Sequence, residues 1–200
     1  MRFKIFIFIV VVTVIMFSSC YAPPYVYDPF PNPTEVVYWS AIRRLEWKDF
    51  VNRIAPNNPL TASEVFIRTQ YDWNKPSGDY PPKFRAVCYV EKSLCWADKR
   101  YVNDNQLFYH QTLFDIYELF MRRMRQDFSK IYSFASSSQI SSNVASIVRA
   151  NENALNLTLQ NYYRDTKRGA NLTEVNRWSG DVFAQLKELE SFKADTAFAP

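Results

Sequence analysis

Hydrophobic residues in the second half of the chain recur every three to four positions, the spacing of one face of an α-helix. From Asn103 this stripe predicts one amphipathic helix of about 25 residues, with Gln106 completing a capping box at its start. A second helix is predicted from Ser138 to about Tyr163. After a polar connector, a third helix begins at Asn171, with Glu174 three residues later. The second half is therefore predicted to be helical.

The first half shows the two-residue alternation of β-strands. Residues 61–73 alternate clearly, and residues 84–90 alternate again after a turn-like segment, which predicts two paired strands. A short strand is expected at 36–39, and residues 45–50 fit either a strand or a turn of helix. The order of elements predicts an α+β domain in which a small antiparallel sheet is followed by three helices.

Composition narrows the possible functions. The chain has 200 residues, of which 48% are hydrophobic and 17% aromatic, enough for the core of one domain. It holds three glycines and neither dinucleotide-binding nor P-loop spacing, so nucleotide cradles of those kinds are excluded. It also has a single histidine, which excludes a metal site that needs two or three imidazoles from one chain.

The N-terminus has the pattern of a bacterial export signal. Arg2 and Lys4 precede an apolar run from Ile5 to Phe17, and the tetrad 17–20 resembles a lipobox that ends at Cys20. At about 1.5 Å per residue the run spans only about 20 Å, too little for a permanent transmembrane helix. The favoured interpretation is a lipoprotein anchored by acylated Cys20 in the cell envelope, periplasm-facing or on the surface. Cleavage near Ala22 with soluble secretion, and an uncleaved anchor, are the alternatives.

The mature chain is expected to have a tether, a domain and a tail. Residues 21–34 are rich in Pro and Tyr and suit an extended tether, residues 35–192 form the domain, and residues 193–200 are a tail. Without residues 1–20 the net charge falls from +4 to +2, since that segment contains two basic residues and no acidic one. The cluster Arg122, Arg123 and Arg125 is expected on a solvated helix face. We therefore expect no nucleic-acid partner.

Export also bears on the cysteines. With Cys20 acylated, Cys88 and Cys95 remain as an even pair in an oxidising compartment, and we expect a disulfide between them. A metal site formed by both thiols and His110 is the alternative.

Several motifs of the domain, taken in order, resemble the bacterial DUF922 family, which is regarded as predicted secreted zinc-dependent proteases. The resemblance covers about residues 36–190, and its order and spacing are more specific than any single piece. The matching positions are Leu45-Glu46-Trp47-Lys48-Asp49-Phe50, Thr61-Ala62-Ser63, Phe114-Asp115-Ile116-Tyr117-Glu118-Leu119 with the arginines 122, 123 and 125, and Tyr162, Thr166, Gly169 and Trp178. The resemblance implies a zincin-like fold.

The resemblance also implies a zinc site, whose ligands this chain lacks. In the family a stretch close to His-Glu-Gln-x-His-Phe-Asp supplies two zinc ligands and a catalytic Glu from one helix. Aligned on Phe114 and Asp115, those places hold Tyr109, His110 and Leu113. The third expected ligand falls on Arg168. The resemblance therefore implies a degenerate metal site, with no metal, no cofactor and no catalytic residue.

The resulting expectation is a pseudo-peptidase that binds an envelope protein or polymer and is not an enzyme. His110 is expected to be a hydrogen-bonded, half-buried residue. The alternatives are a hydrolase with a remodelled cleft, using carboxylates such as Asp115, Glu118 or Asp165, and a zinc peptidase whose metal residues lie elsewhere. The single histidine opposes the last alternative.

Overall fold

The computed structural model describes residues 30–52, 62–74, 82–98, 100, 102–131 and 135–194. The predicted export signal with Cys20, most of the Pro-rich tether, and residues 195–200 of the predicted tail lie outside these ranges. The described elements follow one another in the order β1 (Val36–Tyr38), η1 (a 3-10 helix, Trp47–Asp49), β2 (Ser63–Glu64), β3 (Ile67–Asn74), β4 (Lys83–Glu91), β5 (Trp96–Ala97), α1 (Asp104–Phe128), α2 (Ser137–Thr166), α3 (Leu172–Glu188) and η2 (a 3-10 helix, Glu190–Phe192).

The strands form two small antiparallel sheets. The larger sheet has the order β1-β4-β3, and the smaller one pairs β2 with β5. β3 and β4 pair along their length, from Ile67 opposite Val90 to Asn74 opposite Lys83. β1 pairs only with the last three residues of β4, with Val36 opposite Glu91 and Tyr38 opposite Tyr89. The predicted α+β class, with a small antiparallel sheet followed by three helices, is confirmed.

The strand predicted over 61–73 is divided in the structure. β2 and β3 are separated at Val65 and Phe66, and the two strands join different sheets. The Phe66 amide points at the Sγ atom of Cys95 (3.3 Å), while its carbonyl accepts from the Glu91 amide (3.0 Å). The chain therefore leaves one sheet and enters the other at this point.

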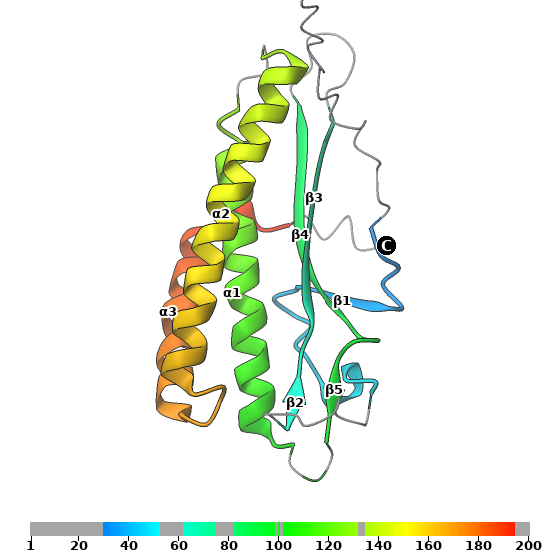
Figure 1. The fold of residues 1–200 in the computed structure, drawn as a ribbon, viewed down its shortest axis with the longest axis vertical. Helices are drawn as coiled ribbons and strands as arrows, with labels where there is room; N and C mark the ends of the chain where they lie inside the picture. The colour runs from blue at the N-terminus through cyan, green and yellow to red at the C-terminus, as the bar shows by residue number, and fades with distance from the viewer. Residues whose placement is uncertain are drawn as a thin grey trace, which may run out of the picture.

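Helix α1 is the centre of the fold. The three helices lie on one side of the large sheet, and α1 contacts β4, α2 and α3 (Figure 1). Because it is enclosed from two sides, α1 is buried almost continuously from Tyr109 to Met124, well beyond a single apolar stripe. Its core residues include Phe114, Ile116 and Phe120, each at most 2% exposed. Polar residues of α1 are therefore buried too and require partners.

The helix boundaries follow their caps. The Asn103 side chain accepts from the amide of Gln106 (3.1 Å), and that of Asn171 from the amide of Glu174 (3.4 Å). α2 continues to Thr166, three residues past the predicted end, and stops where Lys167 and Arg168 adopt left-handed backbone angles. None of the described helices combines the length and apolar character needed to cross a membrane.

The predicted disulfide between Cys88 and Cys95 is wrong in this structure, where both thiols are buried and free. Cys88 lies within β4 and faces α1, with its Sγ atom 3.8 Å from Oε2 of Glu118. Cys95 lies beyond the turn that ends β4, where its thiol donates to the carbonyl of Glu91 (3.2 Å). The two side chains have different neighbours, so the short sequence spacing does not bring them together.

Candidate functional site

The three α1 positions at which the resemblance implies zinc chemistry are packed into the core. Tyr109, His110 and Leu113 are each at most 6% exposed. The ring of Tyr109 stacks on that of Tyr162, with centroids 5.2 Å apart and planes within 8°. The Tyr162 hydroxyl also donates to the backbone oxygen of Tyr109 (2.9 Å). This part of α1 is therefore fixed to α2.

The turn that carries Arg168 lies against the same part of α1. A Cβ atom on Gly169 would be 3.0 Å from Cγ of Tyr109, so the turn approaches the ring closely. The guanidinium of Arg168 lies over the ring of Tyr163, 5.4 Å from its centroid. Burial raises the pKa of the Tyr109 phenol far above its ordinary value, and the charge of Arg168 opposes this only partly. The structure thus brings Tyr109 and Arg168 near one another.

These residues do not suit a divalent metal ion. Leu113 has no donor atom, Arg168 is a cation, and the phenol of Tyr109 stays protonated at neutral pH. No group of three His, Cys, Asp or Glu side chains gathers to hold a metal within the described ranges, which also leaves the alternative site of two thiols and His110 without support.

His110 is a buried core residue rather than a half-buried one. Its Nε2 atom lies 2.8 Å from Oγ of Ser63, which is also buried. The rings of Trp47, Phe50 and Tyr109 surround the imidazole, with centroids 5.1–6.4 Å away. Burial lowers the pKa of His110 to about 3, so the ring is neutral at physiological pH.

The contact between Ser63 and His110 lacks the arrangement of a hydrolase. A catalytic histidine is oriented by an acid on its second nitrogen, but Nδ1 of His110 has no hydrogen-bond partner among the described residues. Both side chains are closed off from solvent, so a substrate has no access to the hydroxyl. Ser63 belongs to the motif at 61–63, but its contact could not be predicted from the sequence because His110 lies 47 positions away.

Asp115 holds the segment after β1 against α1. Its Oδ1 atom accepts from Nε1 of Trp39 and from Nε2 of Gln111, both at 2.8 Å, and Arg44 approaches Oδ2 at 3.4 Å. Gln111 accepts in turn from the amide of Leu45 (2.8 Å). Burial raises the pKa of Asp115, and Arg44 and these hydrogen bonds oppose the rise. The carboxylate of Asp115 therefore has a structural role.

Glu118 is the centre of a buried ion cluster. Its Oε1 atom accepts from Nε of Arg122 (3.1 Å) and from Nη2 of Arg125 (2.5 Å). Arg122 also donates to the carbonyl of Leu186 and to Glu190 (2.8 Å), which ties α1 to the end of α3. The prediction of a solvated arginine face is therefore wrong for Arg122, which is 1% exposed, because α3 and the sheet cover this side of α1.

Asp165 does not join the other two carboxylates predicted for a cleft. It lies at the end of α2, where it pairs with Arg164 (2.9 Å) and Arg177 (3.5 Å) and accepts from Nε1 of Trp178 (3.2 Å). The hydrogen bonds from Arg164 lower its pKa most strongly. The three predicted acids thus hold three different parts of the fold.

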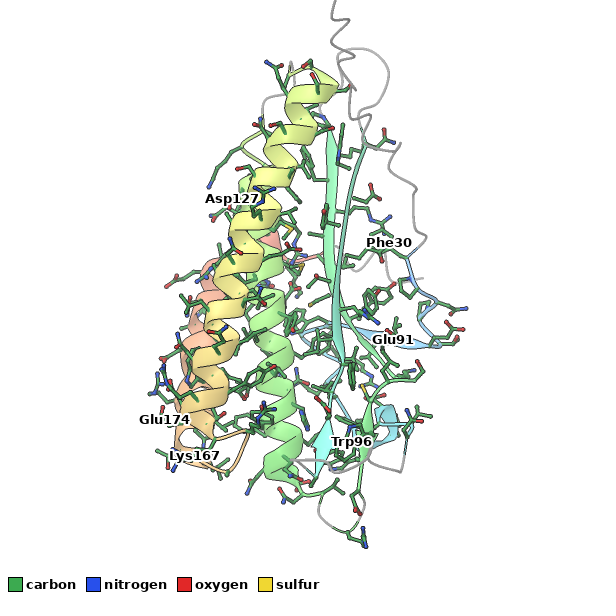
Figure 2. The ribbon with its side chains drawn as sticks, in the orientation of Figure 1. Phe30, Glu91, Trp96, Asp127, Lys167 and Glu174 are labelled. Atoms are coloured by element: carbon green, nitrogen blue, oxygen red, sulfur yellow. The ribbon has the colours of Figure 1, made fainter. Side chains whose placement is uncertain are left out.

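A cavity of about 530 Å³ lies elsewhere, beside β4. Phe30 is one of its lining residues, and Figure 2 shows Phe30 on the strand side of the molecule, away from α2 and α3. The cavity is lined by the chain before β1, by β1 and the residues after it, by five consecutive residues of β4, by the ion cluster, and by the end of the described chain. Its most informative lining residues are Phe30, Tyr38, Trp39, Arg43, Phe84, Arg85, Ala86, Val87, Cys88, Lys92, Glu118, Arg125, Lys193 and Ala194.

The cavity wall is cationic and aromatic. Arg43, Arg85, Lys92, Arg125 and Lys193 line it, whereas Glu118 is its one acidic residue within the described chain. Two guanidinium groups already neutralise Glu118. Of the lining residues, Glu118 was predicted for a cleft and Arg125 lies in the same motif; the others carry no local motif and come from both ends of the domain, so the site as a whole was not predicted.

Comparisons with protein-family models, with curated proteins and with solved structures find no match for this chain.

Proposed function

We propose that this protein is a non-catalytic, membrane-tethered binding domain, a pseudo-peptidase on a zincin-like α+β scaffold that binds an envelope protein or polymer. The observation that carries the proposal is the packing at Tyr109, His110, Leu113 and Arg168. In the alignment with DUF922 these positions correspond to the zinc ligands and the catalytic Glu. Here they hold three buried side chains and a cation, which together cannot ligate zinc.

A binding role is supported by the cavity beside β4. Its volume of about 530 Å³ falls in the usual range of ligand pockets, about 300–1,000 Å³. Aromatic rings and basic groups line it together, which suits a ligand with apolar and anionic parts. The cavity is distinct from the positions of the degenerate metal site, since it shares no lining residue with them. We therefore propose that the scaffold has lost the metal site and binds its ligand in the cavity beside β4.

Anchoring is proposed to occur through acylated Cys20, on the basis of the export signal and lipobox. Acyl chains contribute about 0.8 kcal/mol per buried CH₂, so several chains hold a domain firmly on a membrane. In cell fractionation we expect Cys20→Ala to lose membrane association and Cys88→Ala to retain it. Unchanged membrane retention of Cys20→Ala would contradict the anchor.

The proposal is tested by assaying the purified protein with peptide and cell-wall substrates, with and without a chelator, beside affinity capture from an envelope fraction. We expect no turnover and capture of a stoichiometric envelope partner. The capture should weaken with Lys92→Glu in the cavity and persist with Lys167→Glu in the α2–α3 turn. Turnover that a chelator abolishes would overturn the proposal.

A further inference from the structure

We propose that the cavity binds an extended acidic peptide, which adds as a strand to the part of β4 that β1 leaves uncovered. This inference rests on the proposed function and names the ligand class for that binding site.

The cavity follows the edge of β4. Successive side chains of a strand point to opposite faces of its sheet, so a cavity on one face meets only every second residue. Here the five consecutive residues Phe84–Cys88 all line the cavity. Only the edge of a strand presents such a run. β1 pairs with Tyr89–Glu91, and the Trp39 amide extends this contact to the Cys88 carbonyl, so no strand among the described residues covers the edge from Phe84 to Val87.

The backbone of β4 directs its polar groups toward the cavity at even-numbered positions. The Cys88 carbonyl accepts from the amide of Trp39 (3.2 Å), and the Ala86 carbonyl accepts from Nη1 of Arg125. The Glu91 amide points the other way, to Phe66 on the chain leading into β3. Since these directions alternate along a strand, the polar groups of Phe84 share the cavity side with those of Ala86. A carbonyl oxygen has two lone pairs, so Ala86 can accept from Arg125 and from a ligand amide together.

The basic side chains that line the cavity favour an acidic partner. Two of the lining cations already have acidic partners: Arg43 pairs with Asp49 (2.5 Å) and Lys193 pairs with Glu190 (3.2 Å). Neither of these acids lines the cavity. Lys92 instead donates to the neutral carbonyl of Thr34 (3.0 Å), which leaves its positive charge uncompensated by that contact. An acidic side chain next to Lys92 gains a favourable ion pair, and a basic one is repelled.

Aromatic rings provide the apolar half of the recognition. Phe30, Trp39 and Phe84 line the same cavity, and the guanidinium of Arg85 lies 3.9 Å from the centroid of the Phe30 ring. In strand addition, main-chain hydrogen bonds provide affinity and alternate side chains provide specificity. A peptide that alternates acidic and apolar residues fits both walls.

The test uses fluorescence anisotropy with the purified full chain and a capped peptide that alternates Glu and Val. We expect this peptide to bind and its Gln–Val analogue to bind at least about fivefold more weakly, as the loss of charge pairs predicts. Methylation of alternate peptide nitrogens should abolish binding, because it removes the donors to β4. Lys92→Glu should weaken binding about fivefold, and Lys167→Glu should leave it unchanged.

The inference would be overturned by equal binding of the Gln–Val peptide, by equal binding of the methylated peptide, or by no binding of the Glu–Val peptide to correctly folded protein. Inorganic polyphosphate that competes at the same charge concentration would also overturn it, by showing a general anion site. If the inference fails in any of these ways while no chelator-sensitive turnover is found, the proposed function stands and only the ligand class is wrong.

Discussion

The hydroxyl of Ser63, at the start of β2, lies 2.8 Å from Nε2 of His110 on α1, and both residues are buried. The bond joins the smaller sheet to the central helix, and it satisfies one nitrogen of the only imidazole in the chain. Ser63→Ala leaves that nitrogen without a partner, and we expect a loss of about 1–3 kcal/mol in the free energy of unfolding, measured in urea. The exposed control Ser93→Ala should change it by less than about 0.5 kcal/mol. Equal effects would show that the bond contributes nothing.

Burial of His110 predicts a specific pH dependence. Its pKa falls from 6.5 to about 3 in the folded protein, so between these values the unfolded chain binds a proton that the folded one does not. Stability is therefore lost as pH falls through this window, by up to about 1.4 kcal/mol per pH unit. Relative to His110→Gln, the wild-type protein should lose about 2 kcal/mol between pH 6.5 and pH 5. Parallel pH profiles would contradict a neutral buried ring.

The two described glycines of the helical half should respond oppositely to alanine. Gly169 has φ of +91°, and a Cβ atom there would meet Tyr109 at 3.0 Å, so Gly169→Ala should cost about 1–3 kcal/mol. Gly180 lies within α3 with nothing within 4 Å of its Cβ position, and Gly180→Ala should stabilise by about 0.5–1 kcal/mol. Thermal unfolding of the pair measures both. A harmless Gly169→Ala would show that the turn is not held against α1.

Substitutions of the buried and the exposed members of the ion cluster around Glu118 should lower the free energy of unfolding by different amounts. Arg122→Met removes one of the two guanidinium groups that pair with the buried carboxylate of Glu118 and leaves the Leu186 carbonyl without its donor, and we expect a cost of about 3 kcal/mol in urea unfolding. Glu190→Gln removes a partner whose side chain is 60% exposed, and it should cost less than about 1 kcal/mol. If the two variants lost equal stability, the cluster would not depend on burial.

Both cysteines of the domain should be reduced and shielded. In denaturant without reductant, a Cys20→Ala chain should titrate two thiols with a disulfide reagent. In the native state both should react slowly, since Cys88 and Cys95 are buried and burial raises the pKa of Cys95 to about 11. Absence of reactive thiols in denaturant would restore the disulfide that the sequence favoured.

Local sequence signals predicted the helices well. Asn103 and Asn171 cap α1 and α3 as expected, since capping depends on residues only three positions apart. The strands were less predictable, because strand partners are distant in sequence. β5 was not anticipated, and the alternation over 61–73 gave no sign of the break at Val65 and Phe66.

The candidate site was harder to predict than the strands, because its residues are even more distant from one another in the sequence. The resemblance marked Tyr109 and Arg168, which the fold brings near one another although they lie on different elements. By contrast, the cavity combines Phe30, residues of β4 and Lys193, and no spacing along the chain predicts that meeting. The buried state of Arg122 was also hidden, because a basic residue gives no local sign that α3 covers it.

The proposed scaffold holds no catalytic metal, and the zinc content of the purified protein measures this property directly. The protein is incubated with excess zinc, dialysed, and analysed by elemental mass spectrometry beside a known zinc peptidase. We expect a zinc content at the background level, because Tyr109, His110, Leu113 and Arg168 offer no ligand set. Zinc retained near one equivalent per chain would contradict it.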